Sequence, residues 1–496
     1  MFSTRRLARW SATHPWTVIL AWIGAAITSI VLTAALLSGA LTTQISFLTS
    51  PDSQKGRDLI ASSSLGANSF TETVIVQSDT LTVDDPAFQE RVESLTAELV
   101  EVESVRTAIN FYSTGDPNLV SADRDTAIIP VALPIELKDD VEQTLEIVAE
   151  ANGEDGFLVL ETGEATLDLN FNEAAEEDLL TGETIGIAVA LVILLIVFGA
   201  FVASLVPIFS AILSIVVGLG IVSIIGQFFD LSFFVTNIMV MMGLAVGIDY
   251  SLFILSRYKE ERENNHDKLM AIEIAGGTAS KAVLFSGLTV VFALAGLLIV
   301  PNTIFGSLGV GAIVVVSMTI LQALTLLPAV IGLAGDRIFS LRIPLLKQRT
   351  AQQQSVEGFW AGLARMVMRR PAVSLIAATA VLVLAALPLT QIETGFSGVS
   401  TLPDKFEAKE GFEVLGEEFS AGQSGPVQIV IDAPGGIDPA VERAAADLGV
   451  LISADEGFGP AGSLQLAEEP NLALLAAPMA GDPSSEESYD AIERLR

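Results

Sequence analysis

The sequence contains no cysteine, which excludes disulfide bonds and thiolate chemistry. It has only two histidines, His14 and His266, which lie far apart in the chain and disfavour a histidine-based metal site. No Gly-x-x-x-x-Gly-Lys-Ser/Thr element, Ser-His-Asp set or zinc-binding motif is present, so the residues indicate neither an ATP-driven pump nor an enzyme. We therefore expect no cofactor and no bound metal.

Charged residues are scarce as well. They make up 17% of the 496 residues, whereas 51% are hydrophobic, and this balance is typical of a membrane protein. Seven runs are long and apolar enough to cross a hydrocarbon core as helices, for which about 20 residues are needed. The first run exceeds the apolar core of a signal peptide, about 7 to 15 residues, so we expect an uncleaved helix. The runs are 16–37, 184–202, 205–227, 233–255, 281–300, 305–333 and 372–390.

Positive charge is rare in two long polar segments. Residues 38–183 hold six Lys and Arg against thirty Asp and Glu, and residues 391–496 hold five against twenty. The shorter segments 1–15, 257–281 and 335–370 together hold fifteen against seven. Because short cytoplasmic loops collect Lys and Arg, we expect a cytoplasmic N-terminus and two external segments on an inner (cytoplasmic) membrane. The acidity of the external segments excludes a general nucleic-acid-binding surface there.

The first external segment has the pattern of an α+β domain. Runs rich in Val, Ile and aromatic residues predict strands, and apolar residues at helical spacing predict two helices between them. The order strand, helix, strand, strand, helix, strand matches the split βαβ unit of the ferredoxin-like fold. The predicted strands are 72–77, 107–112, 126–133 and 156–160, and the helices are 86–105 and 141–148.

The chain also repeats itself. Leu-Ala-Arg at 7–9 reappears at 363–365, and Pro-Asp at 51–52 reappears at 403–404. A nearly constant spacing over two membrane entries indicates a tandem duplication, which many transporters carry. The second external domain contains fewer predicted elements than the first, so we expect a fragment that lacks about five further membrane helices.

These observations predict a tandemly duplicated α-helical transmembrane bundle with α+β ferredoxin-like domains outside the cytoplasm, the second half being incomplete. The predicted segments are a first membrane helix (1–37), a first external domain (38–183), membrane helices two to six (184–334), a cytoplasmic linker (335–370), a seventh membrane helix (371–390) and a truncated second external domain (391–496).

One acid lies within the fourth apolar run. Asp249 is sixteen residues after Phe233, about two thirds of the way across at 1.5 Å per residue, so the membrane edge does not explain it. A charge at the bilayer centre costs roughly 2.5 to 3.5 kcal/mol, so an acid there indicates a functional site. A carboxylic acid in low-dielectric surroundings can bind and release a proton, and we expect Asp249 to act as a proton relay. The alternative is a buried acid satisfied by hydroxyl or backbone groups.

Tyr250 follows Asp249 directly and lies about 100° around the helix, so the two side chains do not share a face. Tyr250 either donates a hydrogen bond to an acid on a neighbouring helix, as part of the relay, or packs at a helix seam.

Small and hydroxyl residues complete the candidate site. Gly243 and Gly247 form a Gly-x-x-x-Gly motif, which permits close helix packing, and we expect it to admit a partner helix near Asp249. Ser286 and Thr289 in the fifth run are candidate relay hydroxyls, although hydroxyl groups in membrane helices commonly bond to their own backbone.

Four segments together resemble MmpL-type transporters of the resistance-nodulation-division (RND) superfamily, which is related to sterol-sensing and Patched-like proteins. The segments are 243–258 with its Asp-Tyr pair, 286–290 (Ser-Gly-Leu-Thr-Val), 308–311 (Leu-Gly-Val-Gly) and 324–329 (Leu-Thr-Leu-Leu-Pro-Ala).

The resemblance implies a proton-driven exporter of lipids or other amphiphiles, with porter-type external domains and a proton relay built on Asp249 and Tyr250. In that family the relay uses a second acid from the matching helix of the second half. The implied partners are membrane lipids, an amphiphilic substrate, protons, and the missing second-half helices or a partner subunit. An alternative of another class is a sterol-sensing, lipid-binding receptor or a non-transporting subunit of an export complex.

Overall fold

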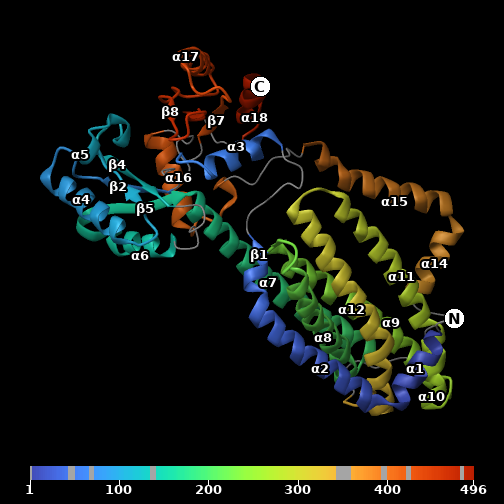
Figure 1. Cartoon of the computed structure of the whole chain (residues 1–496). Helices are drawn as coiled ribbons and strands as arrows, with labels where there is room; N and C mark the ends of the chain where they lie inside the picture. Colours follow the sequence, from blue (N-terminus) through green and yellow to red (C-terminus); the bar gives the residue numbers. More distant parts are fainter. Residues whose placement is uncertain are drawn as a thin grey trace. The chain divides into compact units, whose positions relative to one another are not determined.

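The computed structural model describes residues 3–42, 51–65, 72–133, 141–341, 359–391, 399–419, 426–480 and 485–496. They form two compact units, which we call the helical unit (Met1–Ser50 with Leu179–Pro388) and the mixed unit (Pro51–Asp178 with Leu389–Arg496). Figure 1 shows the elements of both units. Helix α7 (Glu164–Phe198) begins in the mixed unit and ends in the helical unit.

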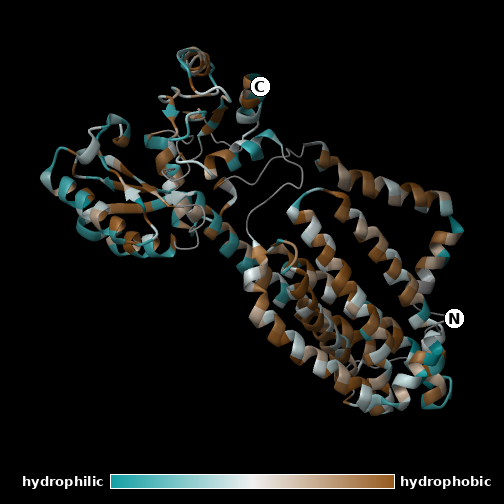
Figure 2. Ribbon diagram, viewed as in Figure 1, coloured by the Kyte–Doolittle hydropathy of each residue, from teal (hydrophilic) through white to brown (hydrophobic). Residues whose placement is uncertain are grey.

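The helical unit consists of long apolar helices, which are mostly brown in the hydropathy colouring of Figure 2. Seven helical segments among the described residues are long and apolar enough to cross a membrane, and each contains or overlaps one predicted run. The prediction of an α-helical, multi-pass membrane protein is therefore confirmed. The segments are Pro15–Leu36, Glu164–Phe198, Phe201–Ile225, Phe234–Glu263, Lys268–Ile299, Thr303–Phe339 and Pro371–Thr390.

The helical unit packs around α8, α9 and α12, which lie against one another (Figure 1). Small residues make this packing close: a Cβ built at Gly220 of α8 would lie 2.5 Å from the Cβ of Ser29 on α2. Trp22 of α2 donates a hydrogen bond from Nε1 to Oγ1 of Thr325 on α12, 3.1 Å away. The helices are α1 (Thr4–Thr13), α2 (Pro15–Leu36), α8 (Phe201–Ile225), α9 (Phe234–Glu263), α10 (Lys268–Gly277), α11 (Ala279–Leu294), α12 (Thr303–Ala334), α14 (Phe359–Arg369) and α15 (Pro371–Ala386).

The polar connection predicted at 257–281 is largely helical. Helix α9 continues to Glu263, and α10 begins after Asp267, whose side chain accepts a hydrogen bond from the backbone N–H of Leu269. An N-cap of this kind satisfies one of the unpaired N–H groups at a helix start. The mixed-charge run 257–263 fits the expected solvated end of a membrane helix, whereas the sequence did not predict α10. Of the linker predicted at 335–370, residues 342–358 lie outside the described part of the chain.

The mixed unit contains a four-stranded sheet in the order β3-β4-β2-β5, in which all neighbours are antiparallel. Alternating side chains give this sheet two buried faces. Helices α4 (Pro86–Glu101) and α6 (Val141–Ala151) cover the face that carries Val74 and Val76, and Ile75 lies on the other face. The strands are β2 (Glu72–Ser78), β3 (Thr107–Ala108), β4 (Thr126–Ala132) and β5 (Phe157–Gly163).

The strand predicted at 107–112 is shorter in the structure. Thr107 and Ala108 form the strand that pairs with β4, Ile109 still donates its backbone N–H to the backbone oxygen of Pro130, and residues Phe111–Thr114 form a one-turn helix, α5. Asn110 starts this turn, because its side chain accepts a hydrogen bond from the backbone N–H of Ser113, and Gly115 ends it at a φ of 70°. The aromatic residues that suggested a strand lie instead at a capped turn.

A second sheet of the mixed unit has the order β7-β9-β8, again antiparallel. Its core joins Leu475 and Ala477 of β9 to Ile452 of α17 and Ala491 of α18. The elements are β7 (Val427–Asp432), α17 (Pro439–Ser453), β8 (Gln465–Leu466), β9 (Leu472–Ala477) and α18 (Glu486–Leu495).

Two helices of the mixed unit pack on sheets that are distant in the sequence. Helix α3 (Asp52–Ala61) precedes the first sheet but contacts β7 of the second, where a Cβ built at Gly56 would lie 3.4 Å from Cγ2 of Val430. Helix α16 (Glu407–Glu418) precedes the second sheet but contacts β5 of the first, where a Cβ at Gly411 would lie 3.3 Å from Cβ of Thr162. The repeated Pro-Asp motifs begin both segments, so the repeats exchange their first helices.

Candidate functional site

Asp249 lies in the middle of α9, fifteen residues after Phe234, where that helix begins. Its side chain is exposed and belongs to a stripe at four-residue spacing that also contains Met241, Ala245 and Phe253. Within the described part of the chain Asp249 has no hydrogen-bond or ion-pair partner. This apolar stripe with a single carboxyl group is the open face of α9, because α8 and α12 pack on its other sides.

Gly243 and Gly247 lie on the buried side of α9 instead. A Cβ built at Gly243 would lie 2.3 Å from Cγ1 of Ile215, and a Cβ at Gly247 would lie 2.7 Å from Cβ of Ala211. Ile215 and Ala211 belong to α8, so the motif allows α8 to approach α9. The expectation that these glycines admit a further helix beside Asp249 does not fit this arrangement, because glycines and acid face different ways.

Tyr250 points between helices rather than along the open face. Its hydroxyl oxygen would lie 3.3 Å from a Cβ built at Gly287 of α11, and its ring packs in the hydrophobic core of the helical unit. The structure therefore separates Tyr250 from Asp249 around the helix, as their adjacent positions require.

The two candidate hydroxyl residues both lie on α11 and are exposed. Thr289 donates its hydroxyl hydrogen to the backbone oxygen of Phe285, 2.9 Å away, which is the common arrangement of hydroxyls in membrane helices. The structure thus brings neither Ser286 nor Thr289 into a hydrogen bond with Asp249.

A buried polar group lies beside Gly247. The hydroxyl groups of Ser214 on α8 and Thr319 on α12 are 3.3 Å apart and fully buried. Gln322, one turn after Thr319, is fully buried, and neither its amide nitrogen nor its amide oxygen has a hydrogen-bond partner among the described residues. Buried amides without partners are rare in proteins, so this position points to a polar role within the bundle.

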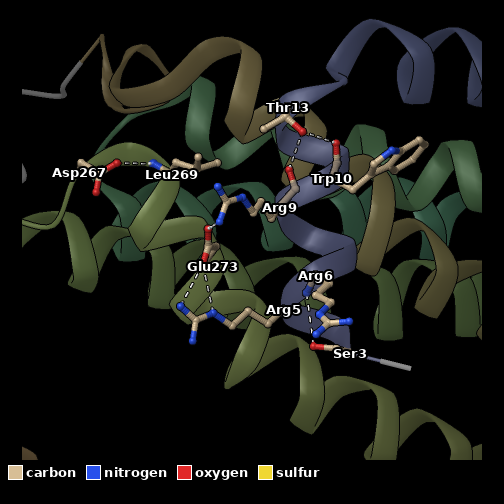
Figure 3. Close-up of polar contacts among 9 residues, drawn as sticks. All are labelled: Ser3, Arg5, Arg6, Arg9, Trp10, Thr13, Asp267, Leu269 and Glu273. Atoms are coloured by element: carbon tan, nitrogen blue, oxygen red, sulfur yellow. Dashed lines mark hydrogen bonds and ion pairs between the residues drawn. The ribbon is translucent and has the colours of Figure 1, made fainter. Parts of the chain in front are cut away.

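A second polar cluster fixes the end of the helical unit that carries α1 and α10 (Figure 3). Arg5 of α1 donates to Oε2 of Glu273 from Nε and Nη2, at 3.1 and 2.9 Å, and Arg9 approaches Oε1 at 2.9 Å. The Glu273 side chain is only 9% exposed. Helix α1 is also held closely, since a Cβ built at Gly276 would lie 2.5 Å from Cβ of Ala8. The three N-terminal arginines suggested only orientation, so this cluster was missed.

No group of three or more His, Asp and Glu side chains in the described ranges is arranged to hold a metal ion. The candidate site therefore consists of a carboxyl group, a tyrosine and helix-packing residues. Such a set can bind, hold and release protons, but it offers no nucleophile placed beside a base.

Comparison with known proteins identifies relatives that are similar in sequence to this chain. A putative membrane protein of Streptomyces coelicolor, SCO6666, is 31% identical over 453 residues, which cover 90% of this chain and 61% of that protein. The mycolic acid-containing lipids exporter MmpL11 of Mycolicibacterium smegmatis is 30% identical over 70% of this chain and 36% of its own length. The heme uptake protein MmpL11 of Mycobacterium tuberculosis matches to the same extent. The chain thus spans between about one third and two thirds of these relatives.

The model of the MMPL family matches residues 49–374, which include α9, the candidate acid and most of the polar segment 38–183. This match and the relatives confirm the resemblance drawn from the four sequence segments. The chain belongs to the MMPL family of membrane transporters.

Proposed function

We propose that this chain is part of a transporter that uses the proton gradient to export lipids or other amphiphiles, with Asp249 as a proton-carrying residue. The observation that carries the proposal is a carboxyl group at mid-helix on an open apolar face. An acid exposed to lipid would be energetically costly, whereas an acid that faces a second helical bundle can exchange its proton with polar groups of that bundle. The family relatives are longer than this chain, which supports a second bundle on that face.

The export of lipids rests on the relatives. One of them is named as an exporter of mycolic acid-containing lipids, and another as a heme uptake protein. All of these cargoes are large and largely apolar, so we propose an amphiphile as the substrate class and export as the direction. The alternative function, a lipid-sensing receptor or a non-transporting subunit, does not require Asp249 to change its charge.

We also propose that the mixed unit contains porter-type domains of the ferredoxin-like fold, outside the cytoplasm of an inner (cytoplasmic) membrane. The antiparallel order β3-β4-β2-β5, with α4 and α6 on one face, supports this assignment, because the split βαβ unit has that order. The second sheet repeats the first three of these positions as β8-β9-β7. The concentration of Lys and Arg in the short segments 1–15, 257–281 and 335–370 supports the external location of the two long segments.

The experiment compares cells that carry the natural gene, a deletion, Asp249→Asn or Asp230→Asn. Asp230 is an exposed acid in the short connection after α8 and serves as the matched control. Lipids of the cell envelope are measured by mass spectrometry, so the substrate need not be known beforehand. We expect Asp249→Asn to reproduce the lipid change of the deletion while the protein level stays normal, and Asp230→Asn to resemble the natural gene.

The outcomes separate the parts of the proposal. If Asp249→Asn restores every lipid that the deletion changes, Asp249 is not the proton carrier. If the deletion changes no lipid, the substrate class is wrong, whatever Asp249 does.

A further inference from the structure

Two buried carboxyl groups lie side by side in the mixed unit. Glu72 begins β2 and Glu161 lies in β5, and the register pairs Glu72 with Gly163 and Val74 with Glu161. The two glutamates are therefore diagonal neighbours on the same face of an antiparallel pair, a distance that long side chains span. Each residue is only 1% exposed. A buried pair of acids is costly unless protons or hydrogen bonds compensate for the charge.

Glu72 holds the first turn of α7. Its Oε1 accepts a hydrogen bond from the backbone N–H of Ala165 at 2.7 Å, and its Oε2 accepts from the N–H and the hydroxyl of Thr166 at 3.2 and 2.6 Å. Free N–H groups at a helix start favour a negative charge. Glu72 is thus the member of the pair that is better able to carry the charge.

Glu161, in contrast, lies where the neutral carboxyl group is favoured over the carboxylate. Its Oε1 is 2.8 Å from the hydroxyl oxygen of Thr144, and that hydroxyl is also 2.8 Å from the backbone oxygen of Val141. A threonine hydroxyl has a single hydrogen to donate. Thr144 therefore shares its hydrogen between the two oxygens when Glu161 is ionised, whereas a protonated Glu161 can itself donate to the Thr144 hydroxyl and leave that hydrogen to Val141. The other oxygen of Glu161 is buried with no hydrogen-bond partner among the described residues, as a neutral carboxyl group tolerates better than a carboxylate.

Among the described residues, the charged groups that act on the pair include no compensating cation. Glu164, the first residue of α7, adds to the repulsion on Glu72. On α6, which carries Thr144, the acids Glu142 and Glu146 are exposed, and on α16, behind β5, Lys409 is paired with Asp404. Burial raises the pKa of Glu72 to about 7, and burial together with the charge of Glu72 raises the pKa of Glu161 well above its usual range.

We propose that Glu72 and Glu161 form a proton-binding site of the mixed unit, in which loss of protons at rising pH weakens the hold of Glu72 on the first turn of α7. The proton of the pair stays on Glu161 while Glu72 accepts hydrogen bonds from the first turn of α7. When both are ionised, their repulsion in a buried site is relieved by opening the junction between β5 and α7. Because α7 continues into an apolar helix, the site links the protonation of this unit to a membrane segment. The inference does not depend on the role of Asp249.

The test measures hydrogen–deuterium exchange of the full chain in lipid nanodiscs between pH 5 and 8, corrected for the intrinsic pH dependence of exchange. The amides of Ala165 and Thr166 report the junction, because they donate to Glu72. In the natural protein we expect their opening to increase with pH by up to about tenfold per unit, the slope for one linked proton. Glu161→Gln, a neutral isostere, should reduce this slope strongly, and Glu150→Gln, an exposed acid of α6, should leave it unchanged.

An independent measurement follows the proton itself. The infrared C=O band of a protonated carboxyl group should be present at pH 7 in the natural protein and reduced in Glu161→Gln. If Glu161→Gln cannot be purified, Glu72→Gln removes the same repulsion from the other strand and should also lower the slope. Opening that does not change with pH, or equal slopes in the natural protein and the Gln variants, would overturn the proposal.

Discussion

Removing the charge of Glu273 should release α1 from the helical unit. In Glu273→Gln the amide nitrogen cannot accept a hydrogen bond from a guanidinium group, so Arg5 and Arg9 lose the carboxylate that they share. Breaking a fully buried pair by removing one partner costs about 3 to 5 kcal/mol. Here the two arginine side chains are 55% and 59% exposed and can return to water, which reduces the expected cost to about 1 to 2 kcal/mol.

The absence of cysteine gives a direct assay for this release. Ser11 of α1 is fully buried, and its hydroxyl has no hydrogen-bond partner in the described ranges, so Ser11→Cys introduces a single thiol with little disturbance. A loss of 1 to 2 kcal/mol should accelerate the reaction of this thiol with a maleimide by about 5- to 30-fold. Glu263→Gln, an exposed acid at the end of α9, is the control and should not change the rate. Equal rates in Glu273→Gln and the parent would refute the reasoning.

Two further predictions concern packing and pH. Gly332→Ala in α12 should destabilise the protein by about 1 to 3 kcal/mol, because the new Cβ would lie 2.6 Å from the backbone oxygen of Ala12. Gly306→Ala in the same helix is the control: its Cβ would meet no atom within 4 Å, so the change should be neutral or stabilising by up to about 1 kcal/mol. Thermal unfolding in detergent measures both effects. The buried pair Glu72 and Glu161 binds protons more tightly in the folded state, because the pKa of both groups is raised. The stability that this proton binding contributes at low pH should therefore be lost as pH rises through about 7, by up to about 3 kcal/mol. A denaturation midpoint that rises from pH 5 to pH 8 would contradict this sign.

Much of the fold follows from local sequence patterns. Apolar runs of sufficient length locate the seven helices, and short runs rich in Val and Ile locate the central strands β2 and β4, whose two faces are both buried. The short turn α5 and the helix α10 were missed, since each depends on a single capping residue, Asn110 or Asp267, that also fits a loop.

The candidate site was only partly accessible from sequence. A lone acid in an apolar run is visible without coordinates, and so is its separation from Tyr250 around a helix. The direction in which Gly243 and Gly247 face is set by which neighbouring helix lies on each side, and this is long-range information. The partners of Glu273 and the contact between Glu72 and Glu161 join residues that are about 90 to 270 positions apart, so no local pattern contains them.

The exchange of α3 and α16 affects how the chain can be made. During synthesis β5 is complete long before residues 407–418 exist, so the sheet face that receives Leu415 stays uncovered while the helices α8 to α15 are produced. Likewise α3 is finished about 370 residues before β7, the strand it covers. Contacts of such long range form late and leave apolar surface open to wrong partners in the meantime. The first sheet therefore stays incomplete until residues 407–418 have been synthesised, whereas α3 is already available when β7 is made.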